Sequence, residues 1–425
     1  MKKDNFKVSV RVITYNHKNY MIKRTDYLDQ ITEFIDKPFV KVLTGIRRSG
    51  KSTLLMLIRD ELLKRGVRKE QILFINLESF DFAFLNNAYD LYRYIQEKIS
   101  TKYRTYVFLD EIQEVNGWEK AVNSLVIDFD TDIYLTGSNS KLLSSELATF
   151  LAGRYVSFQI NTLSFSEYLT FKQHRTNAKI SDVYSEFEIY LRLGGFPSLH
   201  IAEYSFETAY KVVYDIYSSI ILRDTVQRYK IRDVELLERV IKYVFDNIGN
   251  KFSAKKVADY FKSQQRKIDL NTVYNYLNAL EGAFLIRRIQ RYDVKGKEIL
   301  KTLEKYFVSD LSLIYAVMGY KDRMIAGMLE NVVLLELQKK GFRVYVGKTG
   351  QQEIDFVAEK AGKKLYVQVA YLLPEPATVH REFDPLLQLN DHYPKYVVTM
   401  DKTWTDNIKG VQHKHIADFL LMNEF

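Results

Sequence analysis

The chain has 425 residues, of which 47% are hydrophobic, so it is long enough for several buried cores and too apolar for a largely disordered protein. Its 62 Lys and Arg outnumber its 53 Asp and Glu, and the formal charge of +9 favours an anionic partner without identifying it. The lack of cysteine excludes disulfides, thiolate catalysis and Cys-ligated zinc. Because the sequence contains no run of 18 apolar residues and no signal peptide, we expect a cytoplasmic protein without membrane contact.

The first part of the chain has the pattern of a parallel α/β sheet. Residues 1–20 precede it, and we expect them to form an extra strand or a loosely held extension. Five apolar strand candidates then alternate with helical patterns, at residues 39–43, 72–76, 105–109, 132–136 and 155–159. This alternation predicts a parallel sheet with helices on both faces over residues 21–160.

A phosphate-binding loop follows the first of these strands. Residues 45–52 read GIRRSGKS, which matches G-x-x-x-x-G-K-[ST]. In such loops glycines let backbone N–H groups surround the phosphates, while Lys51 would reach the β and γ oxygens and Ser52 would ligate Mg²⁺. The helix expected from Ser52 to about Gly66 would direct its positive end at the same anion. The predicted nucleotide-binding residues are Gly45, Arg48, Ser49, Gly50, Lys51, Ser52 and Thr53.

The third strand candidate ends in two carboxylates that complete a nucleotide site. Asp110 would hold Mg²⁺ through water, and Glu111 would polarise the attacking water. A glutamate directly after this aspartate is typical of NTPases that carry their own catalytic base, so ATP is the expected fuel. The fourth strand ends in Ser138 and Asn139 at the carboxyl edge of the sheet, where either residue would sense the γ-phosphate or only form a turn.

Residues 161–235 have helical patterns and are expected to form a lid. The segment Gly194-Gly195-Phe196-Pro197 interrupts them, as a bend or as a lid element that touches the nucleotide. Four cations follow at Arg223, Arg228, Lys230 and Arg232. They suit phosphate contacts, although a solvated helix face explains them equally well.

A winged-helix pattern occupies residues 236–320. Helical patterns at 234–247, 254–261 and 271–280 precede strands near 284–289 and 306–308. The recognition helix would begin with Asn271, Thr272, Tyr274 and Asn275, and the wing would carry Arg287, Arg288, Arg291, Lys295 and Lys297. Such a domain would bind DNA or serve only as a protein contact.

Residues 321–425 return to an α/β pattern. A helix is expected at 328–340 and carries Glu330. Strands are expected at 343–346, 353–358 and 365–370, and Asp355 projects from the second of them.

These motifs together resemble a prokaryotic family of AAA-superfamily P-loop ATPases, from residue 21 to the end of the chain. The resemblance rests on residues 45–52, 108–113, 135–140, 151–154, 194–197 and 353–357. It implies that Arg154 takes the place of an arginine that reaches a neighbouring subunit's γ-phosphate, which is the sole indication of a homo-oligomer. A strand-start arginine paired with a local carboxylate is the alternative. The resemblance also implies that Pro197 packs near adenine.

The last domain of that family resembles PD-(D/E)XK nucleases. The corresponding metal-site positions here are Asp355, Gln368 and Glu330. Ala370 stands where the nuclease lysine belongs, so nothing orients the attacking water, and Gln368 brings no charge to hold Mg²⁺. To replace the missing nuclease lysine, Lys363 or Lys364 would have to act from the hairpin turn that is expected before the third strand. We therefore predict a degenerate nuclease-like domain that binds nucleic acid or protein without cutting.

Three functions remain open at this point. The preferred one is an ATP-driven switch or remodeller that acts on DNA through the winged helix and the nuclease-like domain. The alternative is a signalling ATPase whose accessory domains bind a protein partner. An ATP-coupled, Mg²⁺-dependent nuclease is the third and weakest.

Overall fold

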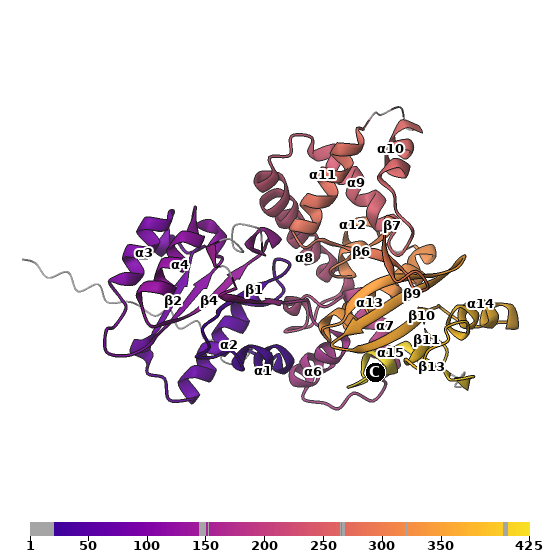
Figure 1. Ribbon diagram of the computed structural model, residues 1–425, viewed down its shortest axis with the longest axis horizontal. Helices are drawn as coiled ribbons and strands as arrows, with labels where there is room; N and C mark the ends of the chain where they lie inside the picture. Colours follow the sequence, from indigo (N-terminus) through magenta and orange to yellow (C-terminus); the bar gives the residue numbers. More distant parts are fainter. Residues whose placement is uncertain are drawn as a thin grey trace, which may run out of the picture.

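The computed structural model describes residues 21–425 apart from 144–149, 152, 264, 266–267, 320 and 403–406. The expected extension at 1–20 and Ala152 lie outside the described residues. Figure 1 shows a first sheet with its helices at one side of the molecule and a second, larger sheet at the other, with a helical layer between and above them.

The first sheet is the parallel sheet that the sequence predicts. Its strands are β1 (Val40–Thr44), β2 (Ile72–Asn76), β3 (Thr105–Asp110), β4 (Thr131–Gly137) and β5 (Tyr155–Gln159). They pair in the order β2-β3-β4-β1-β5, and every pair is parallel. All residues of β1 and β3 are buried, as expected for central strands of a sheet that is covered on both faces.

Helices cover both faces of this sheet. On one face α1 (Thr25–Thr32) and α2 (Lys51–Lys64) pack Ile31, Leu55 and Ile58 against β-strand residues such as Phe108. On the other face lie α3 (Ala88–Gln96) and α4 (Trp118–Asp128), which contribute Leu91 and Val122, respectively, to a separate core. Short 3₁₀ segments occur at Lys69–Gln71, Phe80–Phe82, Ile112–Glu114 and Ser140–Leu143.

A helical region follows the first sheet and is interrupted where the sequence indicates. It contains α6 (Phe165–Thr176), α7 (Val183–Leu193), α8 (Phe206–Ser219) and a π-helical continuation, η7 (Ile220–Gln227). Between α7 and α8 the chain passes through Gly194 and Gly195 into a 3₁₀ turn, Pro197–Leu199. Ser164 and Glu167 form a capping box that fixes the start of α6.

The next elements are three helices followed by a two-stranded hairpin. They are α9 (Val234–Asp246), α10 (Ala254–Ser263), α11 (Leu270–Gly282), β6 (Ile286–Asp293) and β7 (Glu298–Val308). The remaining elements are α12 (Ser312–Met318), a 3₁₀ turn (Asp322–Met324), α13 (Ile325–Lys339), β8 (Arg343–Thr349), β9 (Gln352–Lys360), β10 (Lys363–Val369), α14 (Pro376–Leu387), β11 (Lys395–Thr399), β12 (Asn407–Ile408), β13 (Val411–His415) and α15 (Ile416–Leu420).

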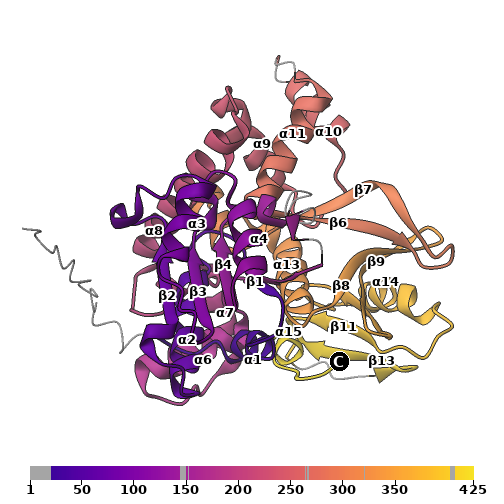
Figure 2. The same cartoon turned by 60° about the vertical axis from the view of Figure 1, so that its left-hand side comes forward.

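The β6–β7 hairpin belongs to the same sheet as the carboxy-terminal strands. The eight strands pair in the order β12-β13-β11-β10-β9-β8-β6-β7. The junction is a parallel pairing of β6 with β8 from Arg291–Val346 to Asp293–Lys348, and Figure 2 shows the hairpin beside β8 and β9. One sheet therefore crosses the domain boundary expected at residue 320, because the hairpin finds its pairing partner in β8. Among the described residues, no helix combines the length and apolar character needed to cross a bilayer.

Candidate nucleotide-binding site

The phosphate loop connects β1 to α2 in the conformation that its glycines permit. Gly45 has φ +147° and Gly50 has φ +96°. A Cβ atom on Gly45 would lie 2.1 Å from the Ile160 carbonyl oxygen, so no other residue fits there. Lys51 is buried, and its Nζ donates to the carbonyl oxygens of Gly45 at 3.0 Å and Ile46 at 3.2 Å. Burial lowers the pKa of Lys51, against the attraction of Glu111 and Asp110.

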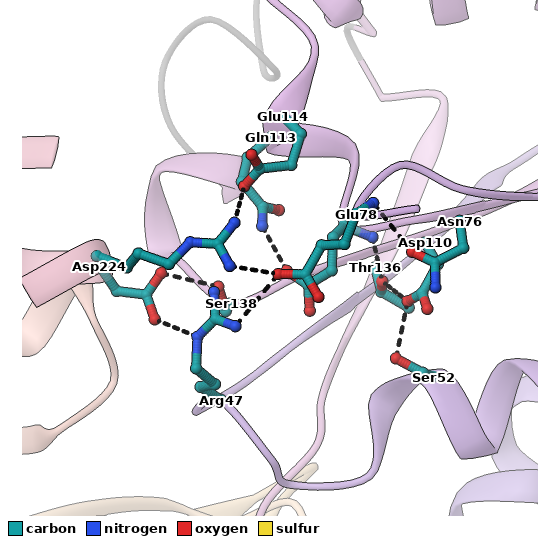
Figure 3. Close-up of polar contacts among 12 residues, drawn as sticks. Arg47, Ser52, Asn76, Glu78, Asp110, Gln113, Glu114, Thr136, Ser138 and Asp224 are labelled. Carbon is teal, nitrogen blue, oxygen red and sulfur yellow. Dashed lines mark hydrogen bonds and ion pairs between the residues drawn. The ribbon is translucent and has the colours of Figure 1, made fainter. Parts of the chain in front are cut away.

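The two predicted Mg²⁺ ligands lie next to each other. Ser52 Oγ donates to Asp110 Oδ1 at 3.0 Å, and Thr136 Oγ1 donates to the same oxygen at 2.5 Å, as Figure 3 shows. Burial raises the pKa of Asp110, while the Thr136 and Ser52 hydroxyls oppose that rise by binding the carboxylate. A carboxylate and a hydroxyl oxygen at the edge of a phosphate loop are the hard ligands that Mg²⁺ prefers, so these residues fit the ion.

Glu111 is held by its backbone as well as by its side chain. It has φ +55°, and its N–H donates to Thr136 Oγ1 at 2.9 Å. Its carboxylate accepts a hydrogen bond from Gln113 Nε2 and lies 4.0 Å from Lys51 Nζ. Burial alone would raise the pKa of Glu111, but Lys51, Gln113 and Arg47 bring it below its ordinary value. The group is therefore ionised, as a base that accepts a proton from water must be.

Of these residues, Lys51, Ser52 and Glu111 line one cavity of about 460 Å³. Its walls include Arg47, Arg48, Gly50, Lys51, Ser52, Thr53, Glu78 and Glu111 at the polar end, with Met21, Ile22, Met56, Leu57, Phe171, Pro197, Ser198 and Ile201 elsewhere. Pro197 Cγ lies 3.6 Å from the position of a Cβ on Gly50. The Gly-Gly-Phe-Pro segment thus lies against the phosphate loop, and the cavity has the charged and apolar parts that a nucleotide needs.

A buried acid fixes the Gly-Gly-Phe-Pro segment. Asp310, which follows β7, accepts from the Gly195 N–H at 2.8 Å and from the Ser312 N–H at 3.0 Å. Gly194 has φ +65°, and a Cβ there would lie 2.0 Å from Asp310 Oδ1. The segment that touches the phosphate loop is therefore tied to the end of a strand in the second sheet.

Sequence analysis missed Arg24, which joins the phosphate loop to the helical region. Its guanidinium donates to the Ser49 carbonyl at 3.0 Å, to the Asn161 carbonyl at 2.9 Å, and to both carboxylate oxygens of Glu167 at 2.8 and 3.0 Å. The residue is 4% exposed. A capping box is visible in the sequence, but nothing there indicates that its glutamate pairs with an arginine 143 residues away.

The fourth strand and η7 share a charged network. Ser138 Oγ donates to Asp224 Oδ1 at 3.2 Å, and Arg47 Nε donates to Asp224 Oδ2 at 2.9 Å, as Figure 3 shows. Arg223 binds Glu78 at 2.8 Å and Glu114 at 3.2 Å. Of the predicted residues, Ser138 therefore contacts η7, and Arg223 contacts carboxylates of the first α/β unit. Asn139, the residue after Ser138, is buried.

Arg154 lies at the edge of the sheet opposite the phosphate loop. It directly precedes β5, and its carbonyl oxygen accepts from the Val40 N–H at 2.8 Å, at the start of β1. Because β1 and β5 are parallel, the phosphate loop at the end of β1 is at the other edge. The exposed Arg154 is thus remote from its own phosphate site, as an arginine that acts on a neighbour must be.

Among the predicted nucleic-acid residues, Arg287 has a different place from the one expected. It is buried, and it donates to Ser309 Oγ at 3.2 Å, Gln338 Oε1 at 2.7 Å and Asn161 Oδ1 at 2.7 Å. Burial lowers the pKa of Arg287 to about 10. Since protein acceptors surround the guanidinium, it is not presented to a phosphate backbone.

The other candidates differ in exposure. Arg288 lies 3.4 Å from Glu281 and 4.0 Å from Glu304. Asn271 and Tyr274 are exposed on α11, whereas Thr272 and Arg228 are half-buried. Arg223 and Arg288 are exposed as well, so a partner can reach these four residues of the set, of which the two arginines already pair with carboxylates.

The predicted nuclease-like position contains a lysine that sequence analysis did not find. Lys305 Nζ, from β7, lies 2.9 Å from Glu330, 3.0 Å from Glu353 and 3.4 Å from Asp355. Burial alone would lower the pKa of Lys305, but these three carboxylates raise it well above its usual value. The ammonium occupies the centre of the acids, so the residues present do not fit a bound Mg²⁺.

The remaining residues of this position are also committed to other contacts. Gln368 donates to Glu382 at 3.0 Å and accepts from the Asp355 N–H at 3.3 Å. Lys364 pairs with Glu359 at 2.7 Å, at the end of the β9–β10 hairpin. Within the described residues no group of three or more His, Cys, Asp or Glu side chains is arranged to hold a metal ion.

Comparison with known proteins identifies the first α/β unit. Residues 37–169 match the family described as an AAA domain, and residues 184–324 match a domain of unknown function, DUF8612. The second match runs from the helical region through the β6–β7 hairpin. It therefore includes both partners of the hydrogen bond between Gly195 and Asp310.

Relatives share most of the chain. An uncharacterized protein of Haemophilus influenzae is 41% identical over 403 residues, which cover 94% of this chain and 99% of that protein. An uncharacterized protein of Methanocaldococcus jannaschii is 31% identical over 346 residues, covering 79% of this chain and 75% of that protein.

Solved structures are more distant. The Walker-type ATPase of Pyrococcus abyssi is 16% identical with a TM-score of 0.49, covering 69% of this chain and 95% of that one. The Aeropyrum pernix Orc1 protein, solved in complex with DNA, is 13% identical with a TM-score of 0.34, covering 71% and 93%. The AAA-domain match, the complete phosphate loop and two relatives that cover 94% and 79% of the chain place it in the family of AAA-type P-loop ATPases to which the H. influenzae and M. jannaschii proteins belong.

Proposed function

We propose that the protein hydrolyses ATP with Mg²⁺ in the cavity between the phosphate loop and the Gly-Gly-Phe-Pro segment. The observation that carries this proposal is the convergence of Lys51, Ser52 and Glu111 on one cavity of about 460 Å³, with Asp110 hydrogen-bonded to Ser52. Residues 21–160 would be the catalytic unit, and residues 161–235 the lid over it.

Each of these side chains has a chemical role in that reaction. Lys51 would leave the Gly45 and Ile46 carbonyls and donate to the β and γ oxygens. Ser52 and Asp110 would hold Mg²⁺, which neutralises phosphate charge when bound. Glu111, kept ionised by Lys51 and Gln113, would orient the attacking water and accept its proton. Pro197 would border the base of the nucleotide.

For the biological role we propose a switch that acts on DNA through α11 and the β6–β7 hairpin. The charge of +9, the exposed Asn271 and Tyr274, and the exposed Lys295 and Lys297 at the hairpin turn support it. A protein-binding switch is the second candidate. The burial of Arg287 and the pairing of Arg223 with Glu78 favour it, because both remove cations from the surface offered to phosphates.

Steady-state ATP hydrolysis tests both levels of the proposal. Wild type, Lys51→Ala and Glu111→Gln are compared with and without duplex and single-stranded DNA at low salt. Turnover that both variants abolish supports the ATPase assignment, and stimulation by DNA supports the DNA-dependent role. Slow turnover unchanged by any DNA would favour the protein-binding switch, and equal turnover in Lys51→Ala would refute the site.

A further inference from the structure

Arg47 belongs to the phosphate loop but has no role in the G-x-x-x-x-G-K-[ST] pattern. It lines the nucleotide cavity and is 9% exposed. Its Nε donates to Asp224 Oδ2 at 2.9 Å, and its Nη1 donates to Glu78 Oε1 at 3.2 Å. Its Nη2 is buried and has no hydrogen-bond partner in the protein. A buried guanidinium nitrogen with an unused donor costs free energy, so it marks a position for an acceptor.

Two carboxylates on different elements fix the direction of this guanidinium. Asp224 is 1% exposed and lies on η7, and its second oxygen accepts from Ser138 Oγ at 3.2 Å. Glu78 follows β2 and is shared with Arg223 Nη1 at 2.8 Å. Figure 3 shows Arg47 between Asp224 and Glu78, on the loop that leads to Ser52. The planar fork thus has two of its nitrogens bound to protein, and the third remains available for a ligand.

An acceptor in this cavity would be a phosphate oxygen. Lys51 and Arg47 supply two cations to the same space, and Glu111 is the acid that the proposed reaction uses. Arginine suits phosphate better than lysine does, because it donates two hydrogen bonds in one plane and can keep a protein partner at the same time. Arg47 and Ser138 both donate to Asp224, which lies on η7. A phosphate bound by Arg47 would therefore be connected to η7 through Asp224.

We propose that Arg47 Nη2 binds the terminal phosphate of ATP in its own subunit, and that Asp224 is the positioning residue that holds Arg47 in place. The inference rests on the proposed ATPase function and adds an arginine that acts in cis, whereas Arg154 can act only on a neighbour. Occupancy by ATP, but not by ADP, would then be transmitted to η7 through Asp224. The π-helical geometry of η7 agrees with this role, since such segments occur frequently at functional sites.

The test separates recognition of the terminal phosphate from binding of the nucleotide in general. Dissociation constants for ATP and ADP are measured with Mg²⁺ by calorimetry in the Glu111→Gln background, and single-turnover hydrolysis is measured in the wild-type background. For Arg47→Gln we expect ATP affinity to fall about tenfold or more, ADP affinity to stay within about threefold, and hydrolysis to slow by about a hundredfold or more. Asp224→Asn should shift the ATP-to-ADP affinity ratio in the same direction by a smaller factor.

Two further variants keep the result interpretable. The double variant Arg47→Gln/Asp224→Asn replaces the charged pair by two amides, so it folds even where the single change leaves Asp224 unpaired. It should still lack the preference for ATP over ADP, because the cation is gone. Arg65→Gln, an exposed arginine at the end of α2, is the matched control and should behave as wild type.

The outcomes distinguish this inference from the function on which it rests. If wild type and Arg65→Gln neither bind nor hydrolyse ATP, the proposed function itself fails. If wild type hydrolyses ATP and the Arg47 variants keep its rate and its ATP-to-ADP affinity ratio, the ATPase stands and the role of Arg47 is refuted. Equal weakening of ATP and ADP would also refute it, because a contact with the terminal phosphate affects ATP alone.

Discussion

The ion pair between Arg24 and Glu167 gives a stability difference that can be worked out from the structure. Glu167 is 9% exposed and accepts two hydrogen bonds from the Arg24 guanidinium. Burial alone would raise the pKa of Glu167, but Arg24 lowers it from 4.5 to about 2. A decrease of about 2.5 units corresponds to about 3 kcal/mol in favour of the folded state at neutral pH. We therefore expect Glu167→Gln to lower the free energy of unfolding by about 3 kcal/mol near pH 7.

The pH dependence of this difference follows from its sign. A carboxyl whose pKa is lower in the folded state stabilises the fold above its unfolded value of 4.5, and this stabilisation is lost as the pH falls toward 2. The gap between wild type and Glu167→Gln should shrink by about 2 kcal/mol between pH about 7 and pH about 3. Urea unfolding of both proteins across this range measures it, since other titrating groups cancel in the difference. A gap below about 1 kcal/mol at pH about 7, or one that does not change with pH, would refute the reasoning.

Three other predictions concern separate parts of the molecule. Burial lowers the pKa of His200 from 6.5 to about 4, so its contribution to the free energy of unfolding is present above pH 6.5 and is lost as the pH falls. We expect the free energy of unfolding to fall by about 2 kcal/mol between pH about 8 and pH about 5. Urea unfolding should show no such loss in His200→Gln. If Arg154 acts on the ATP of a neighbouring subunit, mixing the inactive variants Lys51→Ala and Arg154→Ala should restore ATP turnover. A mixed oligomer without recovered turnover would refute this action of Arg154. Lys305→Met leaves Glu330 without its cation, so we expect the free energy of unfolding, measured by urea unfolding, to fall by about 3 kcal/mol or more; a variant as stable as wild type would contradict this.

The grouping of the candidate nucleotide-site residues was largely predictable because they lie in short local patterns. The strands at 40–44, 72–76 and 105–110 begin or end within about two residues of the expected positions, and they bring Asp110 beside Ser52 as expected. Parallel strands buried on both faces have a strong apolar signal, and the loops at their carboxyl ends converge by geometry.

The contacts that join distant segments were not predictable in the same way. Arg287 follows an apolar residue in a basic run, which indicates a wing, yet its acceptors Asn161 and Gln338 are 126 and 51 residues away. Lys305 likewise has no local sign of the acids around it, because Glu330 and Asp355 come from α13 and β9. The periodicity of apolar residues indicates which face of a helix or strand is buried, but it does not indicate which polar side chain that face contacts.

The course of β7 has a mechanical consequence. Lys305 lies on this strand among the acids of the carboxy-terminal cavity, and only four residues separate it from Asp310, whose carboxylate holds Gly195 beside the phosphate loop. An extended strand resists stretching, so a displacement at one end moves the other end with it. A displacement of the Gly-Gly-Phe-Pro segment is therefore expected to reach Lys305 and its acids through β7, so the two positions are mechanically linked.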